Sequence, residues 1–171
     1  MDLKEFIRDV PDFPKPGIVF KDITPILLNP KALSHAIDGL ADAFRESGVT
    51  KVAGIESRGF IFGVPVSERL GVGFVPIRKE GKLPAKVISH TYALEYGEGV
   101  VEIHDDAVGP GDRVVIVDDL LATGGTAEAA VYLVRRLGAE VVGLAFVVEL
   151  GFLGGRAKLD GVPIDSLITY D

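Results

Sequence analysis

Two adjacent carboxylates, Asp118 and Asp119, follow the apolar run 114–117 and precede a loop of small residues. The run is continuous and β-branched, which is typical of a strand covered on both faces in a parallel sheet. Carboxylates at the end of such a strand are costly to bury unless a cation or a polar group meets them. The pair is therefore a candidate for binding a metal ion or the hydroxyls of a polyol.

A candidate anion site follows the acids directly, in residues Ala122, Thr123, Gly124, Gly125 and Thr126. Backbone N–H groups and two hydroxyls can converge there on one small anion, and the helix expected over 127–137 adds the positive end of its dipole. Acids beside a phosphate cradle indicate a sugar phosphate. The alternative is a tight strand-to-helix turn with an acidic cap, since Asp and Thr are good caps and Gly is a good turn residue.

A second expected strand-to-helix junction carries Glu56, Ser57, Arg58 and Gly59. Its backbone N–H groups and the guanidinium fork of Arg58 could hold a second phosphate or a diphosphate. A capped turn with a surface arginine explains the same residues equally well. In open α/β sheets ligands bind beyond the carboxyl ends of the strands, and both unusual junctions are expected at such ends.

A basic loop over 78–86, with Arg78, Lys79 and Lys82, stands out in an acidic chain. Cations on a mobile lid could cover a diphosphate, whereas the plain alternative is a solvated loop. The position after an expected strand favours the lid.

Two further segments carry weaker signals. Glu95 and Tyr96 follow the basic loop, where an acid could take a proton, although a surface hairpin is the simpler interpretation. Phe20, between Val19 and Lys21, could stack on a flat heterocycle while nearby backbone groups read its edge. On physical grounds alone, ordinary core packing of Phe20 is favoured.

The elements that must position these residues follow from hydrophobic periodicity and from turn residues. We expect helices over 3–10, 30–47, 60–70 and 127–137; strands over 51–55, 73–76, 100–103, 114–117, 141–148 and 167–170; an extended piece over 17–20; and irregular chain over 78–98.

Strands that alternate with helices predict an α/β fold, doubly wound around a mainly parallel central sheet. The 171 residues suit one domain, 1–171, and no linker divides them.

Composition excludes several classes of function. The net charge of −7 argues against nucleic acid or an anionic membrane as a partner, and no apolar run reaches membrane-spanning length. The chain has no cysteine, and its three histidines lack the spacing of a zinc site. Neither a G-x-x-x-x-G-K-[ST] loop nor a G-x-G-x-x-G after a strand is present. The N-terminus lacks the apolar region of a signal peptide, so we expect a cytoplasmic protein.

The acidic pair with Thr-Gly-Gly-Thr resembles the signature of the type I phosphoribosyltransferases. Within that family, the motifs at 13–25, 56–63, 75–84, 94–97 and 117–126 resemble the adenine phosphoribosyltransferases, in the right order and over nearly the whole chain. The resemblance implies the family's sheet with a small hood, about 11–28, and a flexible catalytic loop, about 78–98. It also implies a homodimer.

The resemblance further implies a reaction, in which adenine and 5-phosphoribosyl 1-diphosphate give AMP and diphosphate with Mg²⁺ as cofactor. Asp118 and Asp119 would address the ribose hydroxyls and the metal, mainly through water, and Ala122–Thr126 would cradle the 5′-phosphate. The diphosphate would meet the loop at Glu56, Ser57 and Arg58, with a cis peptide expected at Glu56–Ser57, and the cations Arg78, Lys79 and Lys82.

In the same family pattern the adenine hood would consist of Val19, Phe20 and Lys21, closed by Leu150. Glu95 would meet ring nitrogen 7 as candidate general base, with Tyr96 beside it, and Arg58 and Lys79 would stabilise the departing charge. Glu80 departs from the pattern, because many relatives carry an uncharged or basic residue there, and it weakens the positive charge of the loop.

Two alternatives remain open. The first is a phosphoribosyltransferase for hypoxanthine, guanine or xanthine, which would need a hood that reads a 6-oxo group. The second is a regulator that senses phosphoribosyl diphosphate, but such proteins usually add a DNA-binding domain, and the chain has no basic recognition helix.

Overall fold

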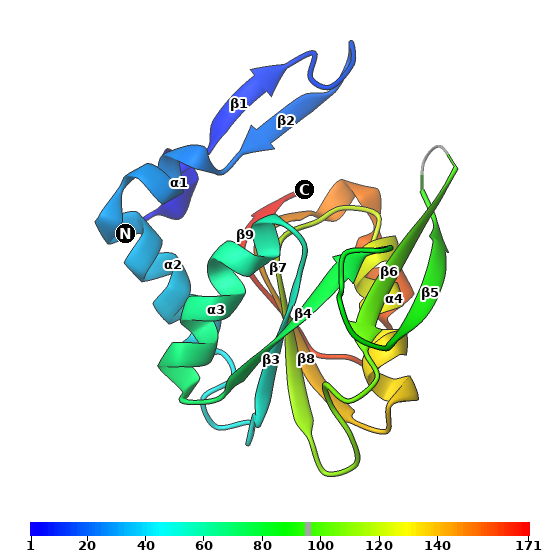
Figure 1. The fold of residues 1–171 in the computed structure, drawn as a ribbon. Coiled ribbons are helices and arrows are strands. Elements are labelled where there is room, and N and C mark those ends of the chain that lie inside the picture. Colours follow the sequence, from blue (N-terminus) through cyan, green and yellow to red (C-terminus); the bar gives the residue numbers. More distant parts are fainter. Residues whose placement is uncertain (95–96) are drawn as a thin grey trace.

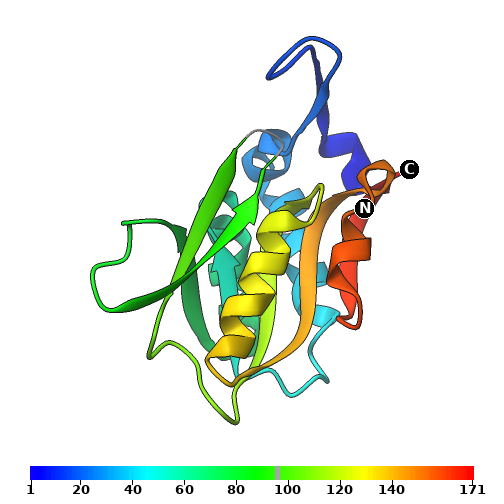
Figure 2. The same cartoon turned by 90° about the vertical axis from the view of Figure 1, so that its right-hand side faces the viewer.

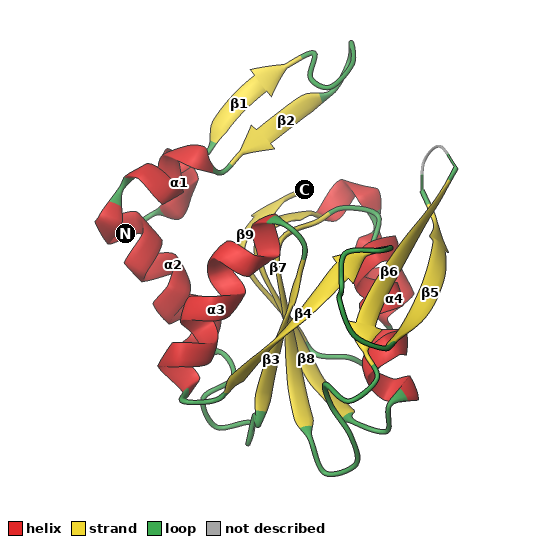
Figure 3. Ribbon diagram, in the orientation of Figure 1, coloured by secondary structure: helices red, strands yellow, loops and turns green. Residues whose placement is uncertain are grey.

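The polypeptide forms a seven-stranded sheet with helices on both faces and a separate two-stranded hairpin (Figure 1). A computed structural model describes residues 1–94 and 97–171. Figure 3 distinguishes the helices from the strands. The strands are β1 (Arg8–Pro11), β2 (Val19–Asp22), β3 (Lys51–Ile55), β4 (Gly73–Lys79), β5 (Val87–Ala93), β6 (Glu98–His104), β7 (Arg113–Leu121), β8 (Glu140–Leu150) and β9 (Ile164–Tyr170). The α-helices are α1 (Thr24–Leu28), α2 (Pro30–Asp42), α3 (Arg58–Leu70) and α4 (Gly125–Arg136), and the 3₁₀ helices are η1 (Leu3–Phe6), η2 (Gly151–Leu153) and η3 (Gly155–Leu159).

The strand order of the large sheet is β5-β6-β4-β3-β7-β8-β9. Strands β4, β3, β7, β8 and β9 pair in parallel, whereas β5 and β6 form an antiparallel hairpin at one edge. Strand β7 lies at the centre, between β3 and β8. The expected doubly wound, mainly parallel α/β sheet is therefore confirmed.

Alternating side chains of β7 divide the apolar core into two layers. Val115 and Val117 pack with residues of α2 and α3, whereas Val114 and Ile116 pack with residues of α4. Figures 1 and 2 show these helices on opposite faces of the sheet. All four side chains are fully buried. Each buried aliphatic side chain of this size contributes about 1.5–3 kcal/mol, so burial on both faces holds β7 firmly in the sheet.

The β1–β2 hairpin projects from the body of the molecule (Figure 1). Asp22 fastens its base, because its carboxylate accepts hydrogen bonds from the backbone and the hydroxyl of Thr24 and pairs with Arg8 at 2.6 Å. The hydrogen bonds from Thr24, helped by Arg8, lower the pKa of Asp22 to about 2. A carboxylate at this position also directs the chain from β2 into α1.

Several predicted elements are confirmed, with shifted ends. Strand β3 matches 51–55, and the helix expected over 60–70 begins two residues earlier. The helix expected over 30–47 ends at Asp42, and turns lead from there to Gly48, whose φ of +64° suits glycine. Strands β7 and β8 are longer than expected, so Asp118 and Asp119 lie inside β7 rather than after it.

Two expectations about local structure are wrong. The helix predicted over 3–10 is a 3₁₀ turn at Leu3–Phe6 followed by β1, because Arg8–Pro11 pairs with β2. The range 78–98 is also not one irregular loop, because β4 extends to Lys79 and Val87–Ala93 forms β5 against β6. In both places pairing with the next strand of a hairpin overrides a weak local pattern.

None of the helices formed by the described residues has the length and apolar character of a membrane span.

Candidate functional site

The acidic pair lies in the second half of β7, where the core meets the carboxyl end of the sheet. Asp119 is 4% exposed, and its Oδ2 is 2.8 Å from Nε of Arg58 at the start of α3. That buried oxygen receives no hydrogen bond from any described residue, since the Arg58 contact is an ion pair without hydrogen-bond alignment. An acceptor of this kind is available to a ligand.

Burial and proximity perturb both acids. Desolvation, reinforced by the neighbouring charge of Asp119, raises the pKa of Asp118 well above its usual range. Desolvation also raises the pKa of Asp119, although Arg58 opposes the shift. Two carboxylates in one buried strand thus require additional positive charge to be fully ionised together.

The α3 junction contacts the acidic pair through a glycine. A Cβ on Gly59 would lie 2.8 Å from Oδ1 of Asp118 and 2.9 Å from the carbonyl oxygen of Val117. That carboxyl oxygen already accepts the N–H of Asp119 at 2.9 Å. Only glycine lets the start of α3 approach β7 this closely, and the two junctions expected at the same edge of the sheet therefore meet.

The candidate anion cradle combines a left-handed glycine with a helix N-terminus. Gly124 has φ +83°, and α4, 12 residues long, begins at Gly125. The first bond of the helix joins the N–H of Glu128 to the carbonyl of Gly124, so the preceding N–H groups have no intrahelical partner. No side chain caps this end. The alternative of an acid-capped turn is therefore wrong for this junction.

A small cavity, about 80 Å³, is shared by the cradle and Asp118. Asp118, Ala122–Thr126 and Phe146 are among the residues that line it. The volume suits a phosphate-sized group, with the carboxylate of Asp118 within reach of whatever is attached to it.

Glu56 ties the α3 junction to the end of β4. Its Oε2 accepts the backbone N–H of Lys79 at 2.9 Å and Nε of Arg78 at 3.2 Å. Burial opposes the charge of Glu56, but these hydrogen bonds prevail and lower its pKa. The peptide bond between Glu56 and Ser57 is cis, as expected. Ser57 does not cap α3 with its side chain, so this helix N-terminus is also open.

The cations of the basic segment lie beside this junction. Arg78 donates to the carbonyl of Lys82 at 3.1 Å as well as to Glu56. Within the described ranges, the ammonium groups of Lys79 and Lys82 make no ion pair. Glu102 of β6, 8% exposed, accepts the N–H of Gly81 at 3.0 Å and so anchors the turn between them.

The hairpin brings an aromatic ring to the same end of the molecule. The Phe20 ring packs edge-on against Phe13, with centroids 5.2 Å apart, and the guanidinium of Arg58 lies 5.6 Å from its centroid. Phe20 is only partly buried and belongs to neither core cluster, so the core-packing interpretation is wrong. Val19 is 49% exposed.

Tyr170 of β9 anchors the hairpin to the sheet. Nζ of Lys21 lies 4.2 Å from the Tyr170 ring centroid and pairs with Asp9 at 2.7 Å. Leu150, at the end of β8, is the register partner of Tyr170 and packs against the apolar core.

Sequence reasoning thus located most of the residues that converge. Glu95 and Tyr96 lie outside the described residues. Glu102, Gly155 and Tyr170 were missed, because their contacts join segments far apart in sequence. The adjacent glycines Gly154 and Gly155 are a sequence signal for a close backbone approach in this part of the chain.

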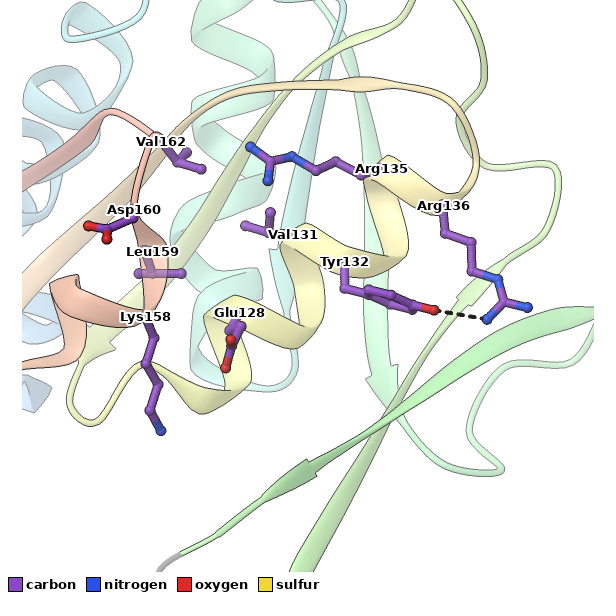
Figure 4. Close-up of a pocket in the computed structure, with 9 residues that line it drawn as sticks. All are labelled: Glu128, Val131, Tyr132, Arg135, Arg136, Lys158, Leu159, Asp160 and Val162. Atoms are coloured by element: carbon purple, nitrogen blue, oxygen red, sulfur yellow. Dashed lines mark hydrogen bonds between the residues drawn. The ribbon is translucent and has the colours of Figure 1, made fainter.

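A larger cavity lies away from these groups. It measures about 510 Å³ and lies between α4 and the turn after η3 (Figure 4). Arg136 is directed toward the hydroxyl of Tyr132, while Arg135 and Lys158 point in other directions. Glu128 and Asp160 offset their charge. This cavity does not gather groups for chemistry.

The acidic pair fits a water-rich magnesium site. No group of three or more metal-ligating side chains occurs in the described ranges. Mg²⁺ keeps several waters and often uses one or two carboxylates together with substrate oxygens, so the carboxylates of Asp118 and Asp119 suit it, with Oδ2 of Asp119 also ion-paired with Arg58.

Comparisons with known proteins agree with this geometry. Residues 23–160 match the family model of the phosphoribosyl transferase domain. The chain is 58% identical over 167 residues to an adenine phosphoribosyltransferase of Thermobifida fusca, covering 98% of this chain and 95% of that protein.

Solved structures give the same result. The crystal structure of an adenine phosphoribosyltransferase from Thermoanaerobacter pseudethanolicus has a TM-score of 0.95 and 56% identity, with 98% of both chains covered. A Saccharomyces cerevisiae adenine phosphoribosyltransferase, complexed with an imino-sugar bisphosphate and adenine, has a TM-score of 0.91 and 46% identity, with 96% of both chains covered.

We predict that Asp118→Asn raises the melting temperature of the metal-free protein at pH 7. Because the pKa of Asp118 is raised by folding, its ionised form costs stability above the ordinary carboxyl range. An amide removes this cost and can still accept the Asp119 N–H. The gain is expected to shrink as the pH falls toward about 4, where the Asp118 carboxyl of the unfolded chain also takes up a proton and the two states no longer differ in its charge.

Thermal unfolding followed by circular dichroism between pH 4 and pH 8 provides the measurement. Asp42→Asn, at an exposed acid paired with Arg45, is the control and should lack this gain at neutral pH. A lower melting temperature for Asp118→Asn throughout the range would contradict the assigned cause.

Proposed function

The chain belongs to the phosphoribosyl transferase family and, within it, to the adenine phosphoribosyltransferases, and we propose that it transfers the 5-phosphoribosyl group from 5-phosphoribosyl 1-diphosphate to adenine. AMP and diphosphate are the products, and the role is purine salvage. The observation that carries this function is the shared cavity of Asp118 and the uncapped N-terminus of α4.

The cradle at Ala122–Thr126 binds the 5′-phosphate in this proposal. Several N–H groups without intrahelical partners and the positive end of α4 favour a dianion there. A sugar attached to that phosphate then extends toward Asp118 and Asp119, whose carboxylates accept hydrogen bonds from its hydroxyls. The 80 Å³ cavity supports this placement because Asp118 and the cradle residues Ala122–Thr126 both line it.

The diphosphate binds at the α3 junction and the end of β4. Ser57 and Arg58 offer an open helix N-terminus and a guanidinium, and Lys79 and Lys82 offer ammonium groups without ion pairs among the described residues. Glu56 has a positioning role, since its carboxylate is already engaged with Arg78 and the Lys79 N–H.

Adenine lies against the hairpin. Phe20 stacks on the base, the backbone groups of Val19 and Lys21 read its edge, and Leu150 closes the other face. The partly buried Phe20 ring and its place outside both core clusters support this role. Arg58 lies between this ring and Asp119, so one side chain borders both the base and the sugar.

The reaction breaks the bond from the anomeric carbon to diphosphate and joins that carbon to ring nitrogen 9 of adenine. Arg58 and Lys79 stabilise the negative charge that grows on the departing diphosphate. The basic segment excludes water, which would otherwise intercept the positively charged ribosyl group. Glu95, with Tyr96 beside it, is the candidate base at ring nitrogen 7. No residue of the chain becomes covalently attached.

Magnesium is the proposed cofactor, held by Asp118 and Asp119 mainly through water. When bound, the ion supplies positive charge to the diphosphate and the ribose hydroxyls. The raised pKa values of both acids support the assignment, since a bound cation offsets the cost of ionising carboxylates in a desolvated site, which is the main cause of both shifts.

A different purine and a sensing role are the alternatives. A 6-oxopurine would need a donor where adenine carries its amino group, and a regulator would bind the sugar diphosphate without turnover. The family membership favours adenine over both.

We also propose that the enzyme is a cytoplasmic homodimer. Ile61 and Val64, one turn apart on α3, are 42% and 50% exposed, and a second copy would cover them. Substrate and product carry phosphate charges that cross no membrane unaided, which suits a cytoplasmic location.

A base-selection assay tests the reaction. Phosphoribosyl diphosphate and Mg²⁺ are offered with adenine, hypoxanthine, guanine or xanthine separately, and nucleotide formation is followed spectrophotometrically. AMP formation from adenine alone, abolished by EDTA and restored by excess Mg²⁺, is the expected result. Turnover of a 6-oxopurine would refute the adenine hood, and turnover in EDTA would refute the metal requirement.

Phe20→Ala should raise the KM for adenine roughly tenfold or more, because a stacked base is worth about 1–3 kcal/mol. The KM for phosphoribosyl diphosphate should change little. Steady-state kinetics with Phe152→Ala as control, at an exposed phenylalanine in η2, provide the comparison. A loss of thermal stability with an unchanged adenine KM would mean that Phe20 serves packing alone.

Sedimentation velocity tests the homodimer, with about twice the chain mass of 18.2 kDa expected. Val64→Asp should shift the protein toward monomer, because a charge at a covered apolar position is unpaired. Leu28→Asp, at a residue 78% exposed on α1, is the matched control. A wild-type monomer at micromolar concentration would exclude the homodimer.

A further inference from the structure

The segment after β8 packs against the back of the phosphate cradle. A Cβ on Gly124 would lie 2.5 Å from the carbonyl oxygen of Gly155, and a Cβ on Gly155 would overlap the carbonyl oxygen of Ala122. Gly155 is buried at the start of η3. Among the described residues, it does not line the cavity that Asp118 and the cradle share. The two backbones therefore touch on the side away from that cavity.

The residue after this contact is fixed by a buried acid. Arg156 donates from Nε to Oε1 of Glu149 at 2.6 Å and from its terminal nitrogen to Oε2 at 2.7 Å. This two-bond arrangement is the strongest and most directional pairing that these side chains form. The Glu149 side chain is 5% exposed, and hydrogen bonding from Arg156 lowers its pKa.

Glu149 lies beside the end of β7, from which the chain enters the cradle. It is the register partner of Leu121 in β7, the residue immediately before Ala122. Leu121 Cδ1 would also be 3.1 Å from a Cβ on Gly155. Glu149 of β8 is therefore connected to the cradle in two ways. One is through Arg156 and Gly155, and the other is through its pairing with Leu121 in the sheet.

The cradle also approaches β5, because a Cβ on Gly125 would lie 3.2 Å from the carbonyl oxygen of Ala93, but its approach to Gly155 is closer. No side chain caps α4, and Gly124 is the residue type with the most backbone freedom. A loop that must present several N–H groups to one anion loses affinity when it has to be ordered on binding. Contact with the fixed backbone of Gly155 is the feature that orders the cradle before the anion binds.

We propose that Gly155, held by the Glu149–Arg156 pair, is a positioning element that keeps Ala122–Thr126 in the conformation that binds the 5′-phosphate. Arg156 touches neither substrate in this proposal and acts through Gly155. The inference rests on the proposed function, because it assigns the 5′-phosphate to this cradle.

Arg156→Lys is the informative change. Lysine keeps the positive charge but cannot form the two-bond fork, so Gly155 loses its fixed neighbour while Glu149 keeps a cation. Arg113→Lys is the matched control, since Arg113 also bonds an acid, Glu140, and a backbone carbonyl, that of Ser47, at the opposite end of β7.

Isothermal titration calorimetry with ribose 5-phosphate and, separately, with magnesium diphosphate gives the readout. Arg156→Lys should weaken ribose 5-phosphate binding roughly tenfold, as expected for a displaced binding group, and leave diphosphate binding within about twofold. The KM for phosphoribosyl diphosphate should rise while the adenine KM stays constant. Arg113→Lys should change neither ligand.

A glycine pair gives an independent test. Gly155→Ala should also weaken ribose 5-phosphate selectively, because its Cβ pushes the cradle aside. Gly109→Ala is the control, since a Cβ there meets nothing within 4 Å. If Gly155→Ala does not fold, the Arg156→Lys result decides alone.

The outcomes separate the two proposals. If the wild-type protein does not bind ribose 5-phosphate, the assigned cradle and this inference both fail. If the wild type binds it and Arg156→Lys binds it equally well, or loses diphosphate affinity to the same extent, the positioning role fails and the proposed function stands.

Discussion

Two neighbouring carboxylates inside the central strand of an apolar sheet are the constraint around which the site is organised. Asp118 and Asp119 extend β7 beyond its buried valines, where ionised acids are costly without compensation. Arg58 supplies part of it, and the N–H of Asp119 binds one oxygen of Asp118. Oδ2 of Asp119 meets Arg58 as an ion pair but receives no hydrogen bond from the described residues, and together with the raised pKa values this describes a site that is completed by a ligand.

Placing phosphate-binding groups beside this pair depends on close approach of backbones. Gly59 lets α3 begin against Asp118, and Gly124 and Gly155 let the tail pack behind the start of α4. Any side chain at these positions would push an open helix N-terminus away from β7. Two helices can therefore direct their positive ends to one edge of the sheet, which is how an acidic protein with a net charge of −7 creates a local field for anions.

The parts that lie outside the sheet are tied to it by single polar contacts. Tyr170 of β9 lies against Lys21 of the hairpin, and Glu102 of β6 holds the turn after β4 at Gly81. Arg58 connects the two regions, because it lies near the Phe20 ring and pairs with Asp119. Segments that must admit and release substrates are thus positioned by few contacts, whereas the cradle and the acids are built into packed backbone.

The sequence by itself determined the architecture, the two strand-to-helix junctions and the residues placed on them. Those features have local causes: the continuous apolar runs of β3 and β7, glycines where two backbones approach each other, and acids next to small residues. The tertiary structure alone decided that Phe20 lies outside the core, that Val87–Ala93 is a strand, and that Glu102, Gly155 and Tyr170 support the site. These outcomes depend on pairing and packing between separate segments of the chain, and the local pattern of residues within one segment does not encode which partner its side chains will meet.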